Sequence, residues 1–320
     1  MTRRTAAWGA AVLALAGCAG APAGTPPTDD AVAPATTVAT ADVPAARVVV
    51  TYSVLGALVR DLVSDAADVE VVVPDGTDPH AYEPSAKDVE AITTADVVVA
   101  NGLGLEEGLE DVLDAAEGAG TVVFRVADHV TVREMGHDDG HDHGSDDEHD
   151  HAAGDPHLWL SPATLAEAVP AMGDAIGAAI GADLSGAVAE VVEDLADLDA
   201  RIAALVGALD ACELVTGHDE LGYFADRYGC EVVGTIIPSL GTTAEATAAD
   251  LAELREVAAE RRTAAIFTGL GTPPEVAARV AADVGVPLVE LRTHAIGPAG
   301  TYESLLLDLA RTIVDALDGA

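Results

Sequence analysis

Short apolar runs alternate along the chain with longer segments in which apolar residues recur every three or four positions. The short runs predict strands and the longer segments predict helices, because apolar residues at helical spacing share one face of a helix. The strands predicted in the first half are residues 47–52, 69–73, 96–100 and 121–126. The helices predicted between them are residues 54–64, 85–93 and 105–115. Strands separated by helices of this length indicate β-α-β units and a parallel sheet.

The same alternation returns in the second half, after a long helical region that starts near residue 162 and breaks at residues 181–183. The strands predicted there are 214–216, 232–236, 265–268 and 288–291, and the helices are 221–227, 246–260, 274–284 and 302–317. We therefore expect an α/β fold with two parallel-sheet lobes, residues 47–182 and 210–320, joined by one long helix at 183–209. In such sheets ligands bind outside the carboxyl ends of strands, which places the site in the cleft between the lobes.

The first eighteen residues have the pattern of a targeting segment. Two arginines precede an apolar stretch at 6–16 that is too short to span a membrane. The stretch ends in Leu-Ala-Gly-Cys, which is typical of a lipobox, in which Cys18 is lipidated and becomes the mature N-terminus. An ordinary signal peptide with an incidental cysteine is the alternative. Residues 19–46 lack large hydrophobic residues almost entirely, which predicts a disordered tether.

These features predict a protein that lies outside the cytoplasm and is anchored to the cell membrane at its N-terminus. Disulfides persist in that compartment. Cys212 and Cys230 each stand directly before a predicted strand, so their side chains can meet if the two strands are parallel neighbours. We predict a structural disulfide between them, and two free thiols are the alternative.

The charge balance of the chain narrows the class of partner. Fifty-five acidic residues against fifteen basic ones give a formal net charge of −40. Such a surface repels phosphate backbones, because affinity for nucleic acids is built from Lys and Arg side chains. We therefore exclude nucleic acid as a partner, whereas divalent cations are attracted to an acidic surface.

Five of the ten histidines crowd into residues 136–151, beside seven acidic residues and no apolar one: His137, His141, His143, His149 and His151. A segment without apolar residues has nothing to bury, so we expect a disordered loop. Imidazoles and carboxylates at this density bind transition metals weakly and in many arrangements. We predict an accessory metal-binding loop, and a solvated charged run that binds no metal is the alternative.

Two of the other histidines lie in near-copies of one motif, Asp-Pro-His-Ala-Tyr at 78–82 and Asp-Pro-His-Leu-Trp at 155–159. The proline fixes the backbone before the histidine, and the aspartate is placed to accept the other imidazole N–H, which sets the tautomer of a metal ligand. His218 and His294 each follow a predicted strand. Four histidines that converge on the cleft suit a closed tetrahedral zinc site. The ligands we predict are His80, His157, His218 and His294.

With these motifs the chain resembles the zinc and manganese substrate-binding lipoproteins of ABC importers, the ZnuA/TroA-like family, from about residue 46 onward. The motifs that carry the resemblance are DPHAYEPS at 78–85, DPHLWLSP at 155–162, GHDELGYF at 217–224, RYG at 227–229 and AIFT at 265–268. The acidic His-rich loop also lies where zinc-specific members carry theirs. The resemblance implies His80, His157 and His218 as metal ligands, and two lobes with a rigid connecting helix.

The fourth ligand position departs from the family pattern. Members have a carboxylate or a solvent molecule where this chain has His294, and many have a glutamate where it has Gly269. An all-nitrogen site favours zinc over manganese, which prefers oxygen, and proton competition at every ligand implies pH-dependent release. Because neutral imidazoles leave the charge of the ion uncompensated, we predict that Asp78, Asp155 or Glu220 supplies negative charge from behind the ligands.

We therefore predict a monomeric binding protein, not an enzyme, that captures Zn²⁺ and hands it to an ABC importer permease. A manganese or iron receptor of the same family and a transporter-independent zinc buffer or adhesin lipoprotein are alternatives. A zinc hydrolase is a third alternative, and it needs three ligands, an open position and a general base. The chain has no His-Glu-x-x-His motif that would place two ligands on one helical face. His129 has no partner motif and is predicted to lie on the surface.

Overall fold

The computed structural model describes residues 46–134, 154–297 and 300–318, all of which fall in one compact unit, residues 44–320. The predicted signal segment with Cys18, the predicted tether up to residue 45 and the predicted metal loop lie outside the described residues. The loop histidines concerned are His137, His141, His143, His149 and His151. No helix within the described ranges combines the length and the apolar character needed to cross a membrane.

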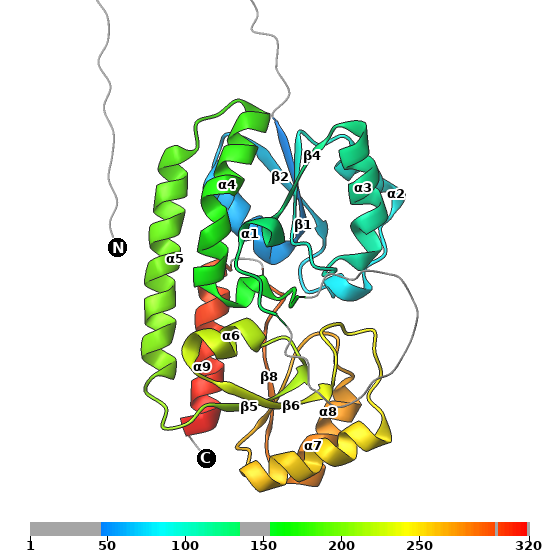
Figure 1. The fold of residues 1–320 in the computed structure, drawn as a ribbon, viewed down its shortest axis with the longest axis vertical. Coiled ribbons are helices and arrows are strands. Elements are labelled where there is room, and N and C mark those ends of the chain that lie inside the picture. Colours follow the sequence, from blue (N-terminus) through cyan, green and yellow to red (C-terminus); the bar gives the residue numbers. More distant parts are fainter. Residues whose placement is uncertain (1–45, 135–153, 298–299, 319–320) are drawn as a thin grey trace, which may run out of the picture. The chain divides into compact units, whose positions relative to one another are not determined.

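A four-stranded parallel sheet with strand order β2-β1-β3-β4 forms the first lobe. Its strands are β1 (Arg47–Tyr52), β2 (Asp68–Val73), β3 (Val97–Ala100) and β4 (Val122–Arg125), and its helices are α1 (Ser53–Val63), α2 (Ala86–Thr93) and α3 (Glu110–Ala119). The central strands β1 and β3 are runs of fully buried valines. Such runs are expected where helices cover both faces of a parallel sheet, and Figure 1 shows α1 on one face with α2 and α3 on the other.

The second lobe contains two parallel strand pairs, β5-β6 and β7-β8, and β5 lies beside β7. Its strands are β5 (Glu213–His218), β6 (Glu231–Ile237), β7 (Ile266–Thr268) and β8 (Leu288–Glu290), and its helices are α6 (Gly222–Tyr228), α7 (Ala248–Arg261) and α8 (Pro274–Val284). We predicted that His218 would follow a strand ending at Thr216. It is instead the last residue of β5, because it pairs with Ile237 of β6.

Three longer helices pack along the lobes: α4 (Pro162–Ile180), α5 (Ser185–Val206) and α9 (Tyr302–Asp318). Figure 1 shows α5 beside both lobes, and it contacts α1 of the first lobe and α6 of the second. The C-terminal helix α9 packs on α5 and α1, so the chain returns to the first lobe after β8. One hydrophobic core therefore extends from Val48 in β1 to Phe267 in β7. The lobe boundaries at residues 182 and 210 remain predictions.

Candidate metal site

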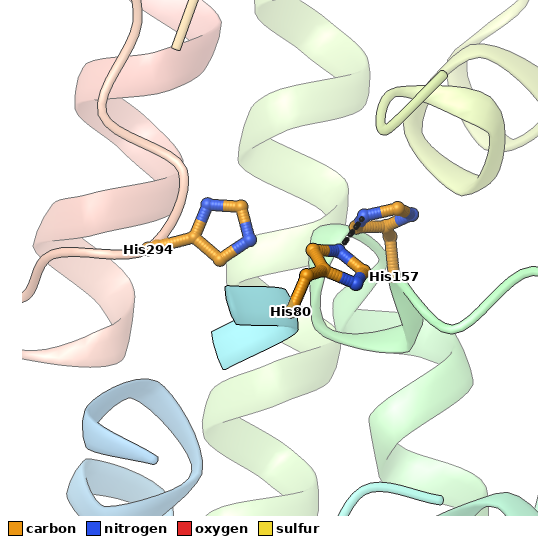
Figure 2. Close-up of side chains that lie close together, drawn as sticks. All are labelled: His80, His157 and His294. Carbon is orange, nitrogen blue, oxygen red and sulfur yellow. Dashed lines mark hydrogen bonds between the residues drawn. The ribbon is translucent and has the colours of Figure 1, made fainter. Parts of the chain in front are cut away.

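Four histidines from distant parts of the chain meet between the two lobes. His157 Nε2 lies 3.2 Å from His80 Nε2 and 3.3 Å from His218 Nε2. The centroid of the His294 ring lies between 6.2 and 6.4 Å from the other three rings. Figure 2 shows the His80 and His157 rings together, with the His294 ring facing them. All four side chains are buried, and His80 is the most exposed at 8%.

Two of the distances between these nitrogen atoms fit a tetrahedral ion. Two nitrogen atoms bound ~2.0–2.1 Å from a tetrahedral zinc ion lie roughly 3.3–3.4 Å apart. The distances from His157 Nε2 to His80 and His218 match that edge. The ligand atoms of His80, His157 and His294 all lie within 4.8 Å of one another. His218 is not in that group, but its Nε2 lies next to that of His157. The structure therefore brings all four predicted ligands together, with unequal distances between them.

The two Asp-Pro-His motifs orient their histidines in different ways. Asp155 Oδ1 accepts hydrogen bonds from the backbone N–H of His157, at 3.0 Å, and from its ring Nδ1, at 2.8 Å. Because the carboxylate accepts from Nδ1–H, the lone pair of His157 is on Nε2, which faces the other imidazoles. Asp78 was expected to hold the ring of His80 in the same way. It instead accepts the backbone N–H of His80 and the hydroxyl of Thr242.

A tryptophan that the motif analysis did not single out packs under two of the imidazoles. The fully buried ring of Trp159 lies 5.4 Å from the ring of His157 and 5.0 Å from that of His294, between centroids. Its Nε1–H donates to the backbone oxygen of Thr293, and its own backbone oxygen accepts from the hydroxyl of Tyr302. Trp159 therefore joins the His157 turn to the segment that carries His294.

Burial keeps the imidazoles neutral. It lowers the pKa of His80 and His218 to about 4. Burial, and then the neighbouring imidazoles, lowers the pKa of His157 and His294 well below its usual range. A neutral imidazole has a free lone pair, so at pH 7 a metal ion needs to displace no proton from these rings. His294 Nε2 is buried without a hydrogen-bond partner among the described residues, as suits an atom that binds an ion.

A buried carboxylate lies behind two of the histidines. Glu220 oxygens lie 3.8 Å from His218 Nδ1 and 3.8 Å from His294 Nδ1. Burial raises the pKa of Glu220 to about 8. A Cβ atom at position 269 would lie 2.8 Å from Glu220 Oε1, so glycine at this position leaves the space for the carboxylate. Of the three carboxylates that we predicted to supply charge, Asp155 touches an imidazole ring directly and Glu220 faces two.

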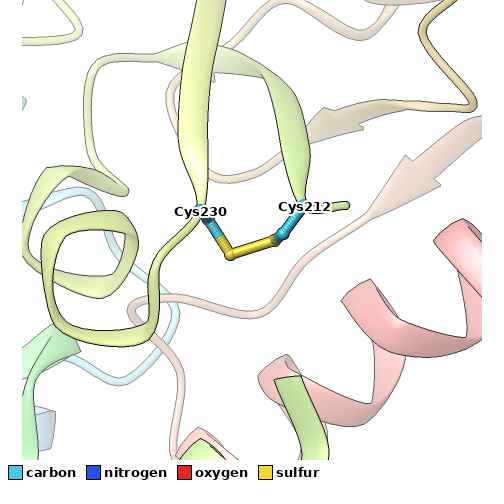
Figure 3. Close-up of a disulfide and its surroundings, with 2 residues drawn as sticks. All are labelled: Cys212 and Cys230. Atoms are coloured by element: carbon cyan, nitrogen blue, oxygen red, sulfur yellow. A yellow bond between two sulfur atoms is a disulfide. The ribbon is translucent and has the colours of Figure 1, made fainter. Parts of the chain in front are cut away.

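Several predicted residues lie away from this cluster. His129 is exposed and stacks on Phe124, with 4.4 Å between the ring centroids. Cys212 and Cys230 are joined by a disulfide at the beginning of β5 and β6 (Figure 3), at the opposite end of β5 from His218. Arg133, which the sequence analysis missed, contacts Asp155. No local pattern marks Arg133, because its partner is 22 positions further along the chain.

The chain is similar to known proteins in both sequence and fold. The family model described as "Zinc-uptake complex component A periplasmic" matches residues 48–316. The high-affinity zinc uptake system protein ZnuA of Bacillus subtilis is 30% identical over 254 residues, which cover 77% of this chain and 78% of that protein. The manganese-binding lipoprotein MntA of Halalkalibacterium halodurans is 26% identical over 275 residues, covering 84% and 86%. The structure of the periplasmic zinc-binding protein TroA from Treponema pallidum matches with a TM-score of 0.75 and 26% identity, covering 86% of this chain and 99% of that one.

Proposed function

Because the chain belongs to the family of periplasmic zinc-uptake components, we propose that it captures Zn²⁺ outside the cytoplasm and delivers it to an ABC importer permease. The match to the family model and the fold shared with TroA confirm the resemblance drawn from the motifs and the predicted two-lobe α/β fold. The observation that carries the proposal is the convergence of four buried, neutral histidines, of which His157 lies at the distance of a tetrahedral edge from both His80 and His218. The ion is cargo, held until the permease takes it.

The donor set supports zinc as that cargo. Zn²⁺ binds imidazole nitrogen readily, whereas Mn²⁺ prefers carboxylate, carbonyl and water oxygen. The relatives include both a zinc uptake protein and a manganese-binding lipoprotein, so the family alone does not choose between the metals. Glu220 is the one described carboxylate that faces two of the four rings, and a manganese receptor would have to recruit it as a ligand.

A binding role also suits the enclosure of the site better than hydrolysis does. A catalytic zinc keeps one coordination position open to water and substrate. Here the four imidazoles meet between the lobes, and none of the four side chains is more than 8% exposed. We propose further that Cys18 anchors the protein to the membrane by a lipid and that the receptor acts as a monomer.

A metal titration of residues 44–320, with and without residues 136–151, tests this function. We expect one tightly bound equivalent of Zn²⁺ in both proteins, measured by competition with a chelating dye, and much weaker binding of Mn²⁺. The intact protein should bind additional Zn²⁺ weakly through the predicted loop. Loss of the tight equivalent on deletion would show that the loop is the binder and the chain a zinc buffer. Tighter binding of Mn²⁺ than of Zn²⁺ would favour the manganese receptor.

Zinc binding at pH 7 should release about one proton, and Glu220 is its source. The raised pKa keeps the Glu220 carboxyl protonated in the metal-free protein at pH 7, and an ion on the adjacent histidines favours the ionised form. The affinity should therefore fall as the pH falls from about 8 towards 6, by at most ~10-fold per pH unit. Below that range Asp155, whose pKa burial raises to about 6, adds to the slope. From the sequence we expected protons to compete with the metal at every ligand, but the imidazoles add little to this slope, because the pKa of His80 and His218 is about 4.

Calorimetry at pH 7 in buffers of different ionisation enthalpy measures this proton. Glu220→Gln should abolish its release. Glu106→Gln is the matched control, because Glu106 is equally buried but its carboxylate hydrogen-bonds to Thr51 and the backbone of Asn101 and not to a histidine. Equal proton release by the wild-type protein and Glu220→Gln would assign the proton to another group.

A further inference from the structure

Arg133 connects the His157 turn of the first lobe to helix α6 of the second. Its Nη1 lies 3.3 Å from Asp155 Oδ2, and its Nε donates to Asp226 Oδ2 at 2.8 Å. Its backbone is held as well, because its N–H donates to the hydroxyl of Tyr223 and its carbonyl accepts from the N–H of Asp155. Two of these contacts therefore fix Asp155, and two reach α6.

The packing around this ion pair leaves no room for a side chain at position 222. A Cβ atom on Gly222, the first residue of α6, would lie 2.4 Å from Arg133 Nη1 and 2.6 Å from Asp155 Oδ2. Glycine thus allows the backbone of α6 to approach the guanidinium and the carboxylate closely. The helix begins four residues after His218, and Asp155 stands two residues before His157, so this contact is close in sequence to two of the predicted ligands.

The Asp155 carboxylate needs a cation such as Arg133 beside it, whereas Asp78, the aspartate of the first Asp-Pro-His motif, does not. The Asp155 side chain is fully buried, and a buried carboxylate is costly unless it is paired and hydrogen-bonded. Asp78 is partly exposed and receives the hydroxyl of Thr242 in place of a cation. Arg133 is the cation that contacts Asp155 among the described residues. The two motifs have the same three residues but different charge partners.

We propose that Arg133 is a positioning residue for zinc capture, which holds the Asp155 carboxylate against His157 Nδ1–H so that His157 Nε2 faces the ion. The role rests on the proposed function. Arg133 acts through Asp155, since partners behind a ligating histidine fix its tautomer and ring orientation. The positive charge of Arg133 also repels a bound cation, but Asp155 lies between them and neutralises it, so the positioning effect dominates.

Arg133→Met tests the proposal, because methionine keeps an aliphatic side chain and removes the charge and the donors. In a protein of residues 44–320, we expect Arg133→Met to bind Zn²⁺ about 10-fold or more weakly than the wild type, measured against a competing chelator. Arg133→Lys should recover part of the loss. In the metal-free protein, ¹⁵N NMR should show His157 as the Nδ1–H tautomer in the wild type and as a mixture of tautomers in Arg133→Met.

Arg125→Met is the matched control. Arg125 is 20% exposed, against 26% for Arg133, and it too pairs with two carboxylates, those of Asp114 and Glu117. We expect wild-type affinity and an unchanged His157 tautomer in this variant. If Arg133→Met folds poorly, Gly222→Ala is the second test, since the added methyl group disrupts the contact between the guanidinium and Asp155 without removing either group. Its affinity for Zn²⁺ should fall as well, and alanine favours the helix.

Equal or tighter zinc binding by Arg133→Met, or a tautomer that does not change, would overturn the role of Arg133. Failure of the wild-type protein to bind Zn²⁺ tightly would instead overturn the proposed function. The two failures are distinguishable, because the tautomer is measured without metal.

Discussion

His157→Ala should lower the affinity for Zn²⁺ by roughly 1,000-fold. An apparent zinc-binding free energy of ~10–16 kcal/mol shared among four ligands assigns about 2.5–4 kcal/mol to each, or roughly 70- to 1,000-fold in affinity. His157 belongs at the upper end, because its Nε2 lies within 3.3 Å of both His80 and His218 Nε2. The substitution also leaves the buried Asp155 carboxylate without its imidazole partner. Competition against a chelator of known zinc affinity measures the loss.

Two further histidine variants set the scale of this result. His294→Ala should cost less than His157→Ala, because His294 lies further from the other rings and Glu220 can offer an oxygen in its place. His129→Ala should bind Zn²⁺ as the wild type does, because His129 is exposed and stacked on Phe124. Wild-type affinity in His157→Ala would refute the cleft site, and wild-type affinity in His294→Ala would remove His294 from the ligands.

Replacing both Cys212 and Cys230 with alanine should lower the free energy of unfolding by about 3 kcal/mol. The bridge joins residues 18 positions apart, and a cross-link that closes a loop of this length mainly restricts the unfolded chain. Zinc affinity should not change, since His218 is at the other end of β5. Urea unfolding of the metal-free protein measures the difference.

A reductant distinguishes the effect of losing the disulfide from the effect of replacing the two cysteine side chains. Dithiothreitol should destabilise the wild-type protein by a similar amount and leave the double variant unaffected. An unfolding midpoint of the wild type that does not respond to the reductant would contradict a stabilising role for the bridge.

The secondary structure could be predicted from the sequence because its local signals agree. Residues 47–52 form β1 with the predicted bounds, and the alternation of short apolar runs with helical segments indicated the parallel sheet. The end of β5 could not be predicted in this way. That strand continues to His218 because β6 pairs with it there, and pairing partners are not encoded locally.

The candidate site also has features that local sequence predicts and features that depend on distant contacts. Its histidines were predictable from two short motifs and two strand ends. The different behaviour of Asp78 and Asp155 was not, because the two motifs begin with the same three residues and differ only in what the fold places next to them. Thr242 is 164 positions from Asp78, and Arg133 is 22 positions from Asp155.

The place of Trp159 under the histidines has an optical consequence. The chain has two tryptophans, and the other one, Trp8, lies in the predicted signal segment. A protein without that segment therefore has a single indole fluorophore, whose ring lies 5.0 Å from His294 and 5.4 Å from His157. Its emission arises beside the proposed ligands, without background from any other indole, so binding and release of metal at the proposed site should be measurable in unlabelled protein.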